Sequence, residues 1–365
     1  MAKLLQSTPA ADGYRMPGEF EAHDGCWMLW PQRPDVWRDN AAPAQHAYCE
    51  VATAIARFEP VTVCANRESY TTARAMLPEH IRVVEMASDD AWIRDCGPTF
   101  VVNDAGDVRG VDWEFNAWGG ELGGLYDSWE QDNLVAQKVL EIERVDRYRA
   151  PVVLEGGAIH VDGEGTLITT SACVLNPNRN GKMPREQMET HLRDYLGVSK
   201  IIWLEFEAFE ETDGHVDGIC AFVRPGVLVV DWTDDPESPE YDVCRSVWEQ
   251  LSGTTDAKGR AFELHKLRAA APHPITAAEA AGIASVPGSY PRLAGDPIGG
   301  TYVNFYIANG GVIVPTYDDP NDEPALQKLA DLFPAREVVG VPAREVAMGG
   351  GMVHCITQQQ PRRRT

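Results

Sequence analysis

The stretch ICAFVRPGVLVVDW (residues 219–232) and the segment YDVCRSVWEQLSG (241–253) that follows it decide the fold class. The first consists of two runs rich in Val, Ile and aromatic residues, and these runs meet at the turn sequence RPG (224–226), which predicts a β-hairpin. The second carries apolar residues at helical spacing and ends on Gly253, which predicts a helix. A hairpin followed by a helix is typical of an α/β protein.

The same alternation extends along the chain in both directions. Further strands are predicted at residues 60–65, 81–86, 98–104, 151–157, 165–175, 200–206, 301–316 and 344–357. Further helices are predicted at residues 44–58, 128–145, 184–197 and 323–334. Residues 254–295 look irregular, and no linker divides the middle. The sequence therefore predicts one catalytic domain over residues 1–365, with flexible ends at about 1–12 and 361–365.

Composition narrows the function classes. The 365 residues are 44% apolar and 24% charged, as in folded globular proteins, and 32 Lys+Arg against 55 Asp+Glu give a net charge of −23. Such a charge repels nucleic acid and anionic membranes and attracts small cations. The sequence has neither an apolar run of membrane-spanning length nor a secretory signal core. The eight cysteines form no CxxC pair, so we expect free thiols and a cytoplasmic location.

Cys355 stands in a distinctive local sequence, because it closes GGGMVHC (349–355). Glycines permit close backbone approach, which suits a loop that contacts a ligand. A free cysteine is more often a buried structural residue, and the other seven cysteines are interpreted in that way. Cys355 is the candidate nucleophile, with a structural thiol as the alternative.

The segment ETDGHVDG (211–218) places His215 two residues before Asp217. If the segment is extended, both side chains project from one face, and an imidazole beside a carboxylate can transfer protons next to a bound cation. A turn capped by His215 would explain the same residues. Zinc binding is a third interpretation, although HExxH and CxxC do not occur.

Three further candidates stand near glycines. Glu155 lies in LEGGAIH (154–160), Asp95 in WIRDCGPT (92–99) and Trp118 in FNAWGGE (115–121). A carboxylate at the carboxyl end of a strand is well placed for a site in an α/β protein, whereas an exposed turn residue or a local ion pair is the ordinary alternative. Trp118 is either a core aromatic or a wall over a cation. Phosphate-loop, calcium-loop and GxSxG motifs do not occur.

The candidate residues are widely and fairly evenly spaced. Asp95, Glu155, His215, Asn304 and Cys355 are separated by 60, 60, 89 and 51 residues. This spacing hints at five units that converge on one axis, although the units share no clear sequence.

Taken together, these segments resemble the agmatine deiminase family of the guanidine-modifying superfamily. The shared motifs are MPGEFEAHDGCWMLWPQRPDVWR (16–38), WxRDxGPT (92–99), FNAWGG (115–120), LEGGAIHVDGEGTLITT (154–170), LNPNRN (175–180), GHVDG (214–218), YVNFYIANGGVIVP (302–315) and GGGMVHCITQQQP (349–361). The resemblance therefore covers nearly the whole chain and is more specific than any single motif.

The resemblance implies a five-bladed α/β propeller with pseudo-five-fold symmetry and a site on its axis. It also implies hydrolysis of agmatine to N-carbamoylputrescine and ammonia, without a cofactor or a metal. By motif, Cys355 matches the nucleophile and His215 the acid/base, while Glu155 matches the carboxylate that pairs with this histidine. Asp95 and Asp217 match the two acids that bind the guanidinium.

The sequence also departs from the family pattern. Met352 and Asp213 stand where the family often has Asn. Neither departure removes a group that the motifs identify as catalytic.

The chemistry agrees with these assignments. A guanidinium is a planar cation whose N–H groups two carboxylates can bind from different edges. A bound cation lowers the pKa of a neighbouring thiol, so Cys355 can attack the central carbon and form a thiouronium. His215 can protonate the departing ammonia and then deprotonate water.

The far end of the substrate suggests further residues. Agmatine carries an ammonium where arginine has a carboxylate beside its amine, and the run LEFEAFEETDGH (204–215) is strongly acidic. Glu211 is our candidate for the group that faces the ammonium, and Trp92 and Trp118 are candidates for walls along the alkyl chain. The other acids of this run, Glu210 among them, are interpreted mainly as solvated.

Alternatives to this function remain open from the sequence. One is a polyamine-binding protein without turnover, which would need the acids but neither Cys355 nor His215. Others are an arginine deiminase, a peptidyl-arginine deiminase and a metal-dependent guanidine hydrolase. The expected partner is a small cation, and neither nucleic acid nor membrane is expected. A homodimer or a larger homo-oligomer is compatible with the sequence.

Overall fold

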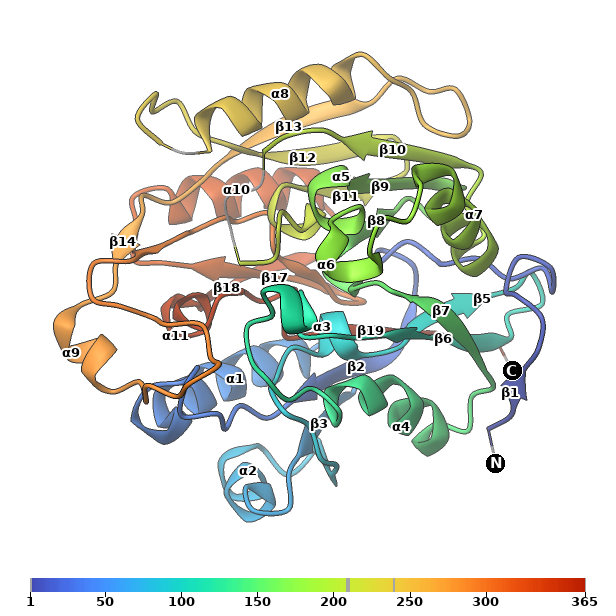
Figure 1. The fold of residues 1–365 in the computed structure, drawn as a ribbon. Helices are drawn as coiled ribbons and strands as arrows, with labels where there is room; N and C mark the ends of the chain where they lie inside the picture. The colour runs from blue at the N-terminus through green and yellow to red at the C-terminus, as the bar shows by residue number, and fades with distance from the viewer. Residues whose placement is uncertain (1, 208–210, 239, 365) are drawn as a thin grey trace.

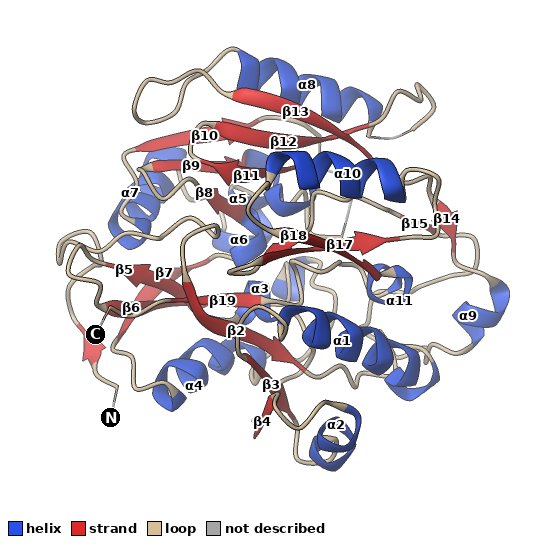
Figure 2. Ribbon diagram, turned by 180° about the vertical axis from the view of Figure 1, so that it is seen from behind, coloured by secondary structure: helices blue, strands red, loops and turns tan. Residues whose placement is uncertain are grey.

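The computed structural model describes residues 2–207, 211–238 and 240–364. In these residues the strands form five sheets of three or four strands and one sheet of two (Figures 1 and 2). The mixed α/β class predicted from the sequence is confirmed. None of the helices in the described ranges is long and apolar enough to cross a membrane.

The five larger sheets share one pattern, an antiparallel pair followed by a strand in parallel pairing. Two of them have four strands. The order in one is β1 (Leu4–Leu5), β7 (Arg147–Val153), β6 (Val108–Glu114), β5 (Thr99–Val102). The order in the other is β19 (Gln358–Pro361), β2 (His23–Leu29), β3 (Val61–Ala65), β4 (Arg82–Glu85). Three have three strands, in the order β10 (Lys200–Leu204), β9 (Thr166–Thr170), β8 (Ile159–Val161); β11 (Cys220–Arg224), β12 (Val227–Trp232), β13 (Glu263–Arg268); and β16 (Tyr306–Ile307), β17 (Gly311–Thr316), β18 (Glu337–Pro342). The small sheet pairs β14 (His273–Pro274) with β15 (Pro297–Ile298).

A helix makes the crossover within each larger sheet, because parallel strands cannot be joined by a tight turn. These helices are α1 (Ala42–Ile55), α4 (Val135–Ile142), α7 (Arg185–Leu196), α8 (Tyr241–Ser252) and α10 (Asp322–Leu332). In α8, Cys244, Val247 and Leu251 are buried at spacings of one helical turn. This face packs on β12 and β13, so that α8 lies on the outside of the molecule (Figure 1).

The remaining helices are short. They are α2 (Tyr70–Met76), α3 (Ile93–Cys96), α5 (Ser171–Val174), α6 (Pro177–Asn180), α9 (Ala277–Ala281), α11 (Arg344–Met348) and the 3-10 turns Asp39–Ala41, Gly120–Leu122, Asp132–Leu134, Gly156–Ala158 and Val216–Gly218. The turn Gly156–Ala158 contacts both α3 and the turn Val216–Gly218. These contacts bring together the three segments that carry Asp95, Glu155 and His215.

Two of the predicted elements are wrong, and the strand predicted at 165–175 ends at Thr170, after which Ser171–Val174 form α5. Residues 344–357, predicted as a strand, form α11 and a turn. Their valines and isoleucine suggested a strand, but Glu345, Ala347 and Met348 are good helix formers. Residues 254–295, predicted to be irregular, contain β13, a largely exposed strand of polar sequence.

The two chain ends contact the rest of the fold where the structure describes them. The sequence predicts flexible ends at about 1–12 and 361–365. In the structure Leu4 and Leu5 pair with β7, and Pro361 pairs with His23 of β2.

Candidate active site

Cys355 lies in the turn that follows α11 and its run of glycines. Its Sγ is 3.4 Å from Asn304 Nδ2 and 3.8 Å from Asp217 Oδ2. Burial, and then the negative charges of Asp217 and Asp95, raise the pKa of the Cys355 thiol well above its ordinary value, whereas the Met352 backbone amide acts in the opposite direction. The thiol therefore stays protonated at neutral pH unless a positive charge comes close.

Three ionisable groups pack closely against Gly157. A β-carbon built on Gly157 would lie 2.5 Å from His215 Nδ1, 2.9 Å from Asp95 Oδ1 and 3.1 Å from Asp217 Oδ2. Any side chain at position 157 would therefore clash with these groups. We refer to Asp95, Asp217, His215 and Gly157 as the acidic cradle.

Each carboxylate of the cradle is held by specific donors. Asp95 accepts hydrogen bonds from the Gly157 amide and from Trp118 Nε1, both at 2.9 Å. Burial raises the pKa of Asp95, and the charge of His215 partly offsets this effect. Asp217 Oδ2 lies 2.8 Å from His354 Nδ1. The cradle thus presents two oriented carboxylates, as recognition of a planar cation requires.

His354 itself lies between two acids. Its Nδ1 faces Asp217, and its Nε2 lies 2.8 Å from Glu19 Oε2. Burial alone would lower the pKa of His354, but Glu19 and Asp217 raise it. With both ring nitrogens facing carboxylates, the charged imidazolium is favoured.

His215 follows a sharp turn of the backbone. Asp213 and Gly214 both have left-handed φ angles, of 61° and 92°, a conformation that Asp and Gly tolerate well. His215 Nδ1 then faces Asp95 at 3.8 Å, and Nε2 faces Glu155 at 3.8 Å. Burial alone would lower the pKa of His215, but Asp95 and Glu155 raise it well above its ordinary value. The imidazole can therefore begin a reaction as an acid.

Arg179 forms an ion pair behind His215. Its Nε donates to Glu155 Oε1 at 2.6 Å, and its Nη1 donates to Asp213 Oδ2 at 2.6 Å. Burial alone would raise the pKa of Glu155, but Arg179 and His215 hold it at about 2. Glu155 is therefore a permanent anion at neutral pH, placed next to the imidazole.

The donor atoms of Glu155, Cys173 and His215 lie within 4.8 Å of one another. Such a set can bind zinc in principle. Here, however, Glu155 already accepts from the Arg179 guanidinium, and a second cation at the same carboxylate would be repelled. The charge distribution fits a proton-transfer pair better than a metal centre.

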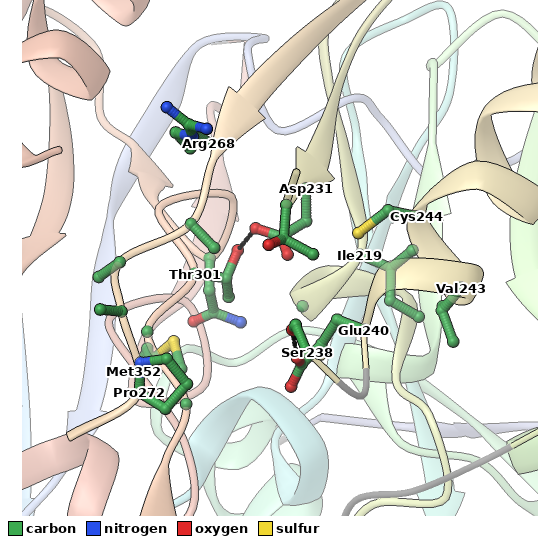
Figure 3. Close-up of a pocket in the computed structure, with 18 of the residues that line it drawn as sticks. Ile219, Asp231, Ser238, Glu240, Val243, Cys244, Arg268, Pro272, Thr301 and Met352 are labelled. Atoms are coloured by element: carbon green, nitrogen blue, oxygen red, sulfur yellow. Dashed lines mark hydrogen bonds between the residues drawn. The ribbon is translucent and has the colours of Figure 1, made fainter. Parts of the chain in front are cut away.

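A cavity of about 430 Å³ opens next to the cradle. Cys355, His215, Asp217 and Asn304 line it together with residues that extend away from them. Figure 3 shows Asp231 and Glu240 on different walls of this opening, with Met352 and Pro272 on another. The other acids on its lining are Asp234, Asp235 and Glu237, with Arg268 as the basic residue among its described members. The cavity is therefore suited to a cation.

The two tryptophans contact the site from outside the large cavity. Trp92 Nε1 donates to Asp90 Oδ2 at 2.8 Å, and the Trp92 ring packs against Trp37 at a centroid distance of 5.2 Å. Together with Trp118 it lines a closed space of about 10 Å³. Among the described residues, neither tryptophan lines the large cavity.

Glu211 does not line the large cavity either, within the residues that the structure covers. It forms a two-pronged ion pair with Arg292 at 2.7 and 2.9 Å. Glu210, from the same acidic run, lies outside the described residues.

Comparison with known proteins fits this geometry. The family model described as Porphyromonas-type peptidyl-arginine deiminase matches residues 15–361. The chain is 57% identical to the agmatine deiminase of Stutzerimonas stutzeri over 360 residues, which is 98% of each protein. The structure is similar to that of the agmatine deiminase of Enterococcus faecalis, with a TM-score of 0.97 and 47% identity over 100% of both chains. The chain belongs to the agmatine deiminase family.

A solved structure of a C. jejuni agmatine deiminase, a cysteine-to-serine variant with substrate bound, is also similar. Its TM-score is 0.82 at 26% identity, and the match covers 96% of this chain and 97% of that one. The mixed α/β architecture is thus shared with agmatine deiminases, although none of the sheets formed by the described residues closes on itself.

Agmatine deiminase motifs predicted part of this arrangement. The structure brings Cys355, His215, Asp95 and Asp217 to one place, with Glu155 behind the histidine. The motif LNPNRN contains Arg179, but its local sequence gives no sign that it reaches Glu155. Glu19 and His354 were also missed, because neither is marked by a spacing pattern.

Proposed function

We propose that this protein hydrolyses agmatine to N-carbamoylputrescine and ammonia, through a covalent intermediate on Cys355. The observation that carries the proposal is the position of the Cys355 thiol, 3.8 Å from the Asp217 carboxylate. Asp217 belongs to the acidic cradle, which also contains the charged His215 imidazole. The family membership and the acidic cavity support a guanidine substrate with a second positive charge.

In the first step the guanidinium binds between Asp95 and Asp217, which accept its N–H groups. Its positive charge offsets the two carboxylates that hold the thiol in its protonated form, so Cys355 loses its proton to solvent water on binding. The thiolate attacks the central carbon and forms a C–S bond. This step gives a tetrahedral adduct on the enzyme.

In the second step His215 donates its proton to one terminal nitrogen, the C–N bond breaks, and ammonia leaves. The remaining species is a thiouronium ester of Cys355. Neutral His215 then takes a proton from water, the hydroxide adds to the carbon, and the C–S bond breaks. The proton of the added hydroxyl group passes to the departing thiolate, so the oxygen stays in the product as the carbonyl of N-carbamoylputrescine and the thiol is restored.

Glu155 has a supporting role in this proposal. Its negative charge, fixed by Arg179, faces the imidazole at 3.8 Å. This charge favours the imidazolium that the first half of the reaction needs. Both acid and base steps can therefore use one histidine.

The preference for agmatine over arginine follows from the charges around the site. A free carboxylate would enter a cavity lined by acids, and it would need a cationic clamp. Arg268 already pairs with Asp234 at 2.8 Å, and the Nη atoms of Arg292 donate to Glu211 and Gly349. These contacts disfavour the second reaction class, in which free or peptidyl arginine is the substrate.

Three further residues are proposed for the far end of agmatine. Trp92 and Trp118 remain proposed walls for the alkyl chain, since Trp118 donates to Asp95 and Trp92 packs against Gly351. Glu211 remains a proposed partner of the ammonium. It would have to share its oxygens with Arg292.

We also infer that the five larger sheets are the blades of a pseudo-five-fold propeller within one domain over residues 1–365. Each sheet repeats an antiparallel pair, a crossover helix and a parallel strand, and this repetition supports the arrangement. Cytoplasmic location stays a prediction, supported by the free state of all eight cysteines. A homodimer or larger homo-oligomer also stays a prediction.

The test is ammonia release from agmatine, free arginine and a blocked arginyl peptide, measured side by side. We expect kcat/KM for agmatine to exceed that for arginine by at least about 10³, roughly 4 kcal/mol in transition-state binding. Comparable efficiency on arginine or on the peptide would overturn the substrate assignment. Binding of agmatine without ammonia release would favour a polyamine-binding protein, and loss of activity with a chelator would favour a metal hydrolase.

A further inference from the structure

One guanidinium joins the two loops that carry the proposed nucleophile and proton shuttle. We call residues 349–355 the cysteine loop and residues 211–215 the histidine loop. Arg292 Nη1 and Nη2 donate to the two oxygens of Glu211 at 2.7 and 2.9 Å, and Nη2 also donates to Gly349 O at 2.6 Å. The side chains of Arg292 and Glu211 are 6% and 20% exposed. Arg292 thus contacts the first residue of each loop.

The cysteine loop has little room to move. A β-carbon built on Gly349 would lie 2.3 Å from the Trp37 ring, and one built on Gly350 would lie 2.7 Å from Glu211 Oε2. A β-carbon on Gly351 would lie 2.5 Å from the Trp92 ring and 3.0 Å from Cys355 Cβ. The loop is therefore confined by two tryptophans and by the Glu211–Arg292 pair.

The segment that carries Arg292 is itself attached to the body of the protein. Its anchoring contacts are Ala284 N to Pro34 O at 2.7 Å, Tyr290 N to Leu125 O at 2.9 Å, and Ser289 Oγ to Asp35 Oδ2. The body of the protein therefore holds Arg292 in place, and Arg292 can in turn fix the positions of the two loops.

We propose that Arg292 is a positioning residue that sets the place of Cys355 relative to His215. Catalysis by a nucleophile and a proton shuttle depends on their separation, and a displacement of about 1 Å can cost about 10²-fold in rate. Arg292 is suited to this task because a planar guanidinium holds a carboxylate and a carbonyl at once in fixed directions. The kcat part of its test rests on the proposed function, because it requires turnover of agmatine.

The chain offers a control ion pair with the same hydrogen-bond geometry in a more exposed place, with side chains 39% and 34% exposed. Arg15 pairs with Glu21 through the same atoms, Nη1 to Oε1 at 2.8 Å and Nη2 to Oε2 at 3.0 Å. This pair contributes no residue to the cavity next to Cys355. Arg15→Gln thus removes an ion pair of the same geometry away from the site.

The experiment compares Arg292→Gln, Arg292→Lys and Arg15→Gln by kcat, KM, thermal unfolding and the rate at which iodoacetamide alkylates Cys355. We expect Arg292→Gln to lower kcat at least about 10²-fold with KM changed less than about 3-fold, and Arg292→Lys to recover part of the loss. Arg15→Gln should change kcat and KM less than about 3-fold. The alkylation rate of Cys355 should change in Arg292→Gln and not in Arg15→Gln.

A kcat of Arg292→Gln close to that of Arg15→Gln would overturn the proposal, and so would a loss confined to KM. The latter result would instead fit Glu211 as the partner of the substrate ammonium. If Arg292→Gln does not fold, Arg292→Lys is judged against wild type by the same criteria, since it keeps the charge but loses the two-pronged geometry. Alkylation of Cys355 needs no turnover, so an unchanged alkylation rate contradicts the positioning role even if agmatine proves not to be the substrate.

A double variant adds an independent criterion. If Glu211 and Arg292 act as one clamp, Glu211→Gln combined with Arg292→Gln should lower kcat no further than Arg292→Gln alone. Effects on kcat that multiply would contradict the clamp.

Discussion

Replacing Asp217 by Asn should make Cys355 more reactive toward an alkylating agent while it abolishes most turnover. Asp217 Oδ2 lies 3.8 Å from Cys355 Sγ, and at an effective dielectric constant of about 20 one charge at this distance opposes thiolate formation by about 4 kcal/mol. The His354 imidazole, 2.8 Å from the same carboxylate, offsets part of this energy. We expect about 1.5–3 kcal/mol to remain, which is a roughly 10–100-fold faster alkylation below the pKa of the thiol.

The assay is the rate of iodoacetamide labelling between pH 7 and 9 without substrate, followed by peptide mass spectrometry. Cys49 is an internal control, because burial raises its pKa to about 11 and Asp217 is not among the causes. Turnover of agmatine should fall in the same variant, since the bound guanidinium loses a charged partner worth at least about 2–5 kcal/mol. Labelling of Cys355 that is no faster than in the wild type would refute the claim that Asp217 keeps the thiol protonated.

Three further substitutions probe the surroundings of the cradle. Gly157→Ala should lower kcat/KM for agmatine at least about 10²-fold with little change in circular dichroism, because its β-carbon would clash with the imidazole and the two aspartates and displace them; near-normal turnover would contradict that geometry. Arg179→Gln should raise the pH at the midpoint of acid unfolding. The pKa of Glu155 is held at about 2 in the folded protein, so ionised Glu155 stabilises the fold at pH values above the ordinary pKa of a glutamate, and this stabilisation is lost as the pH falls through about 2. Without Arg179 the loss occurs at higher pH. An unchanged midpoint would argue against the pair. Trp118→Phe removes the donor to Asp95 and should lower kcat/KM about 5–30-fold, measured by ammonia release; an unchanged value would mean that Asp95 needs no such support.

Local signals in the sequence sufficed for the elements whose partners are close in the chain. The hairpin at residues 219–232 and α8 form where their patterns predict, because the alternation of Val and Ile and the helical spacing of Cys244, Val247 and Leu251 reflect burial directly. The strand predicted at 344–357 is wrong for the opposite reason. There the packing of α11 overrides the β-branched residues of the segment.

The site itself could be predicted only through its resemblance to a family. Asp95 and Glu155 are 60 residues apart, and their even spacing suggests convergent units but does not specify which side chains meet. Arg292 lies 81 residues from Glu211, so the pairing that removes Glu211 from the list of free carboxylates left no trace in the local sequence. Long-range ion pairs of this kind depend on the arrangement of the sheets, which the sequence pattern does not specify.

The central claim is that agmatine forms a covalent bond with Cys355. The most direct measurement is intact-protein mass spectrometry after rapid acid quenching during turnover, with peptide mapping of the modified residue. We predict a species whose added mass equals agmatine less ammonia, located on Cys355 and absent from Cys355→Ser. Turnover of agmatine by Cys355→Ser at a rate near that of the wild type, or an adduct on another residue, would contradict the account.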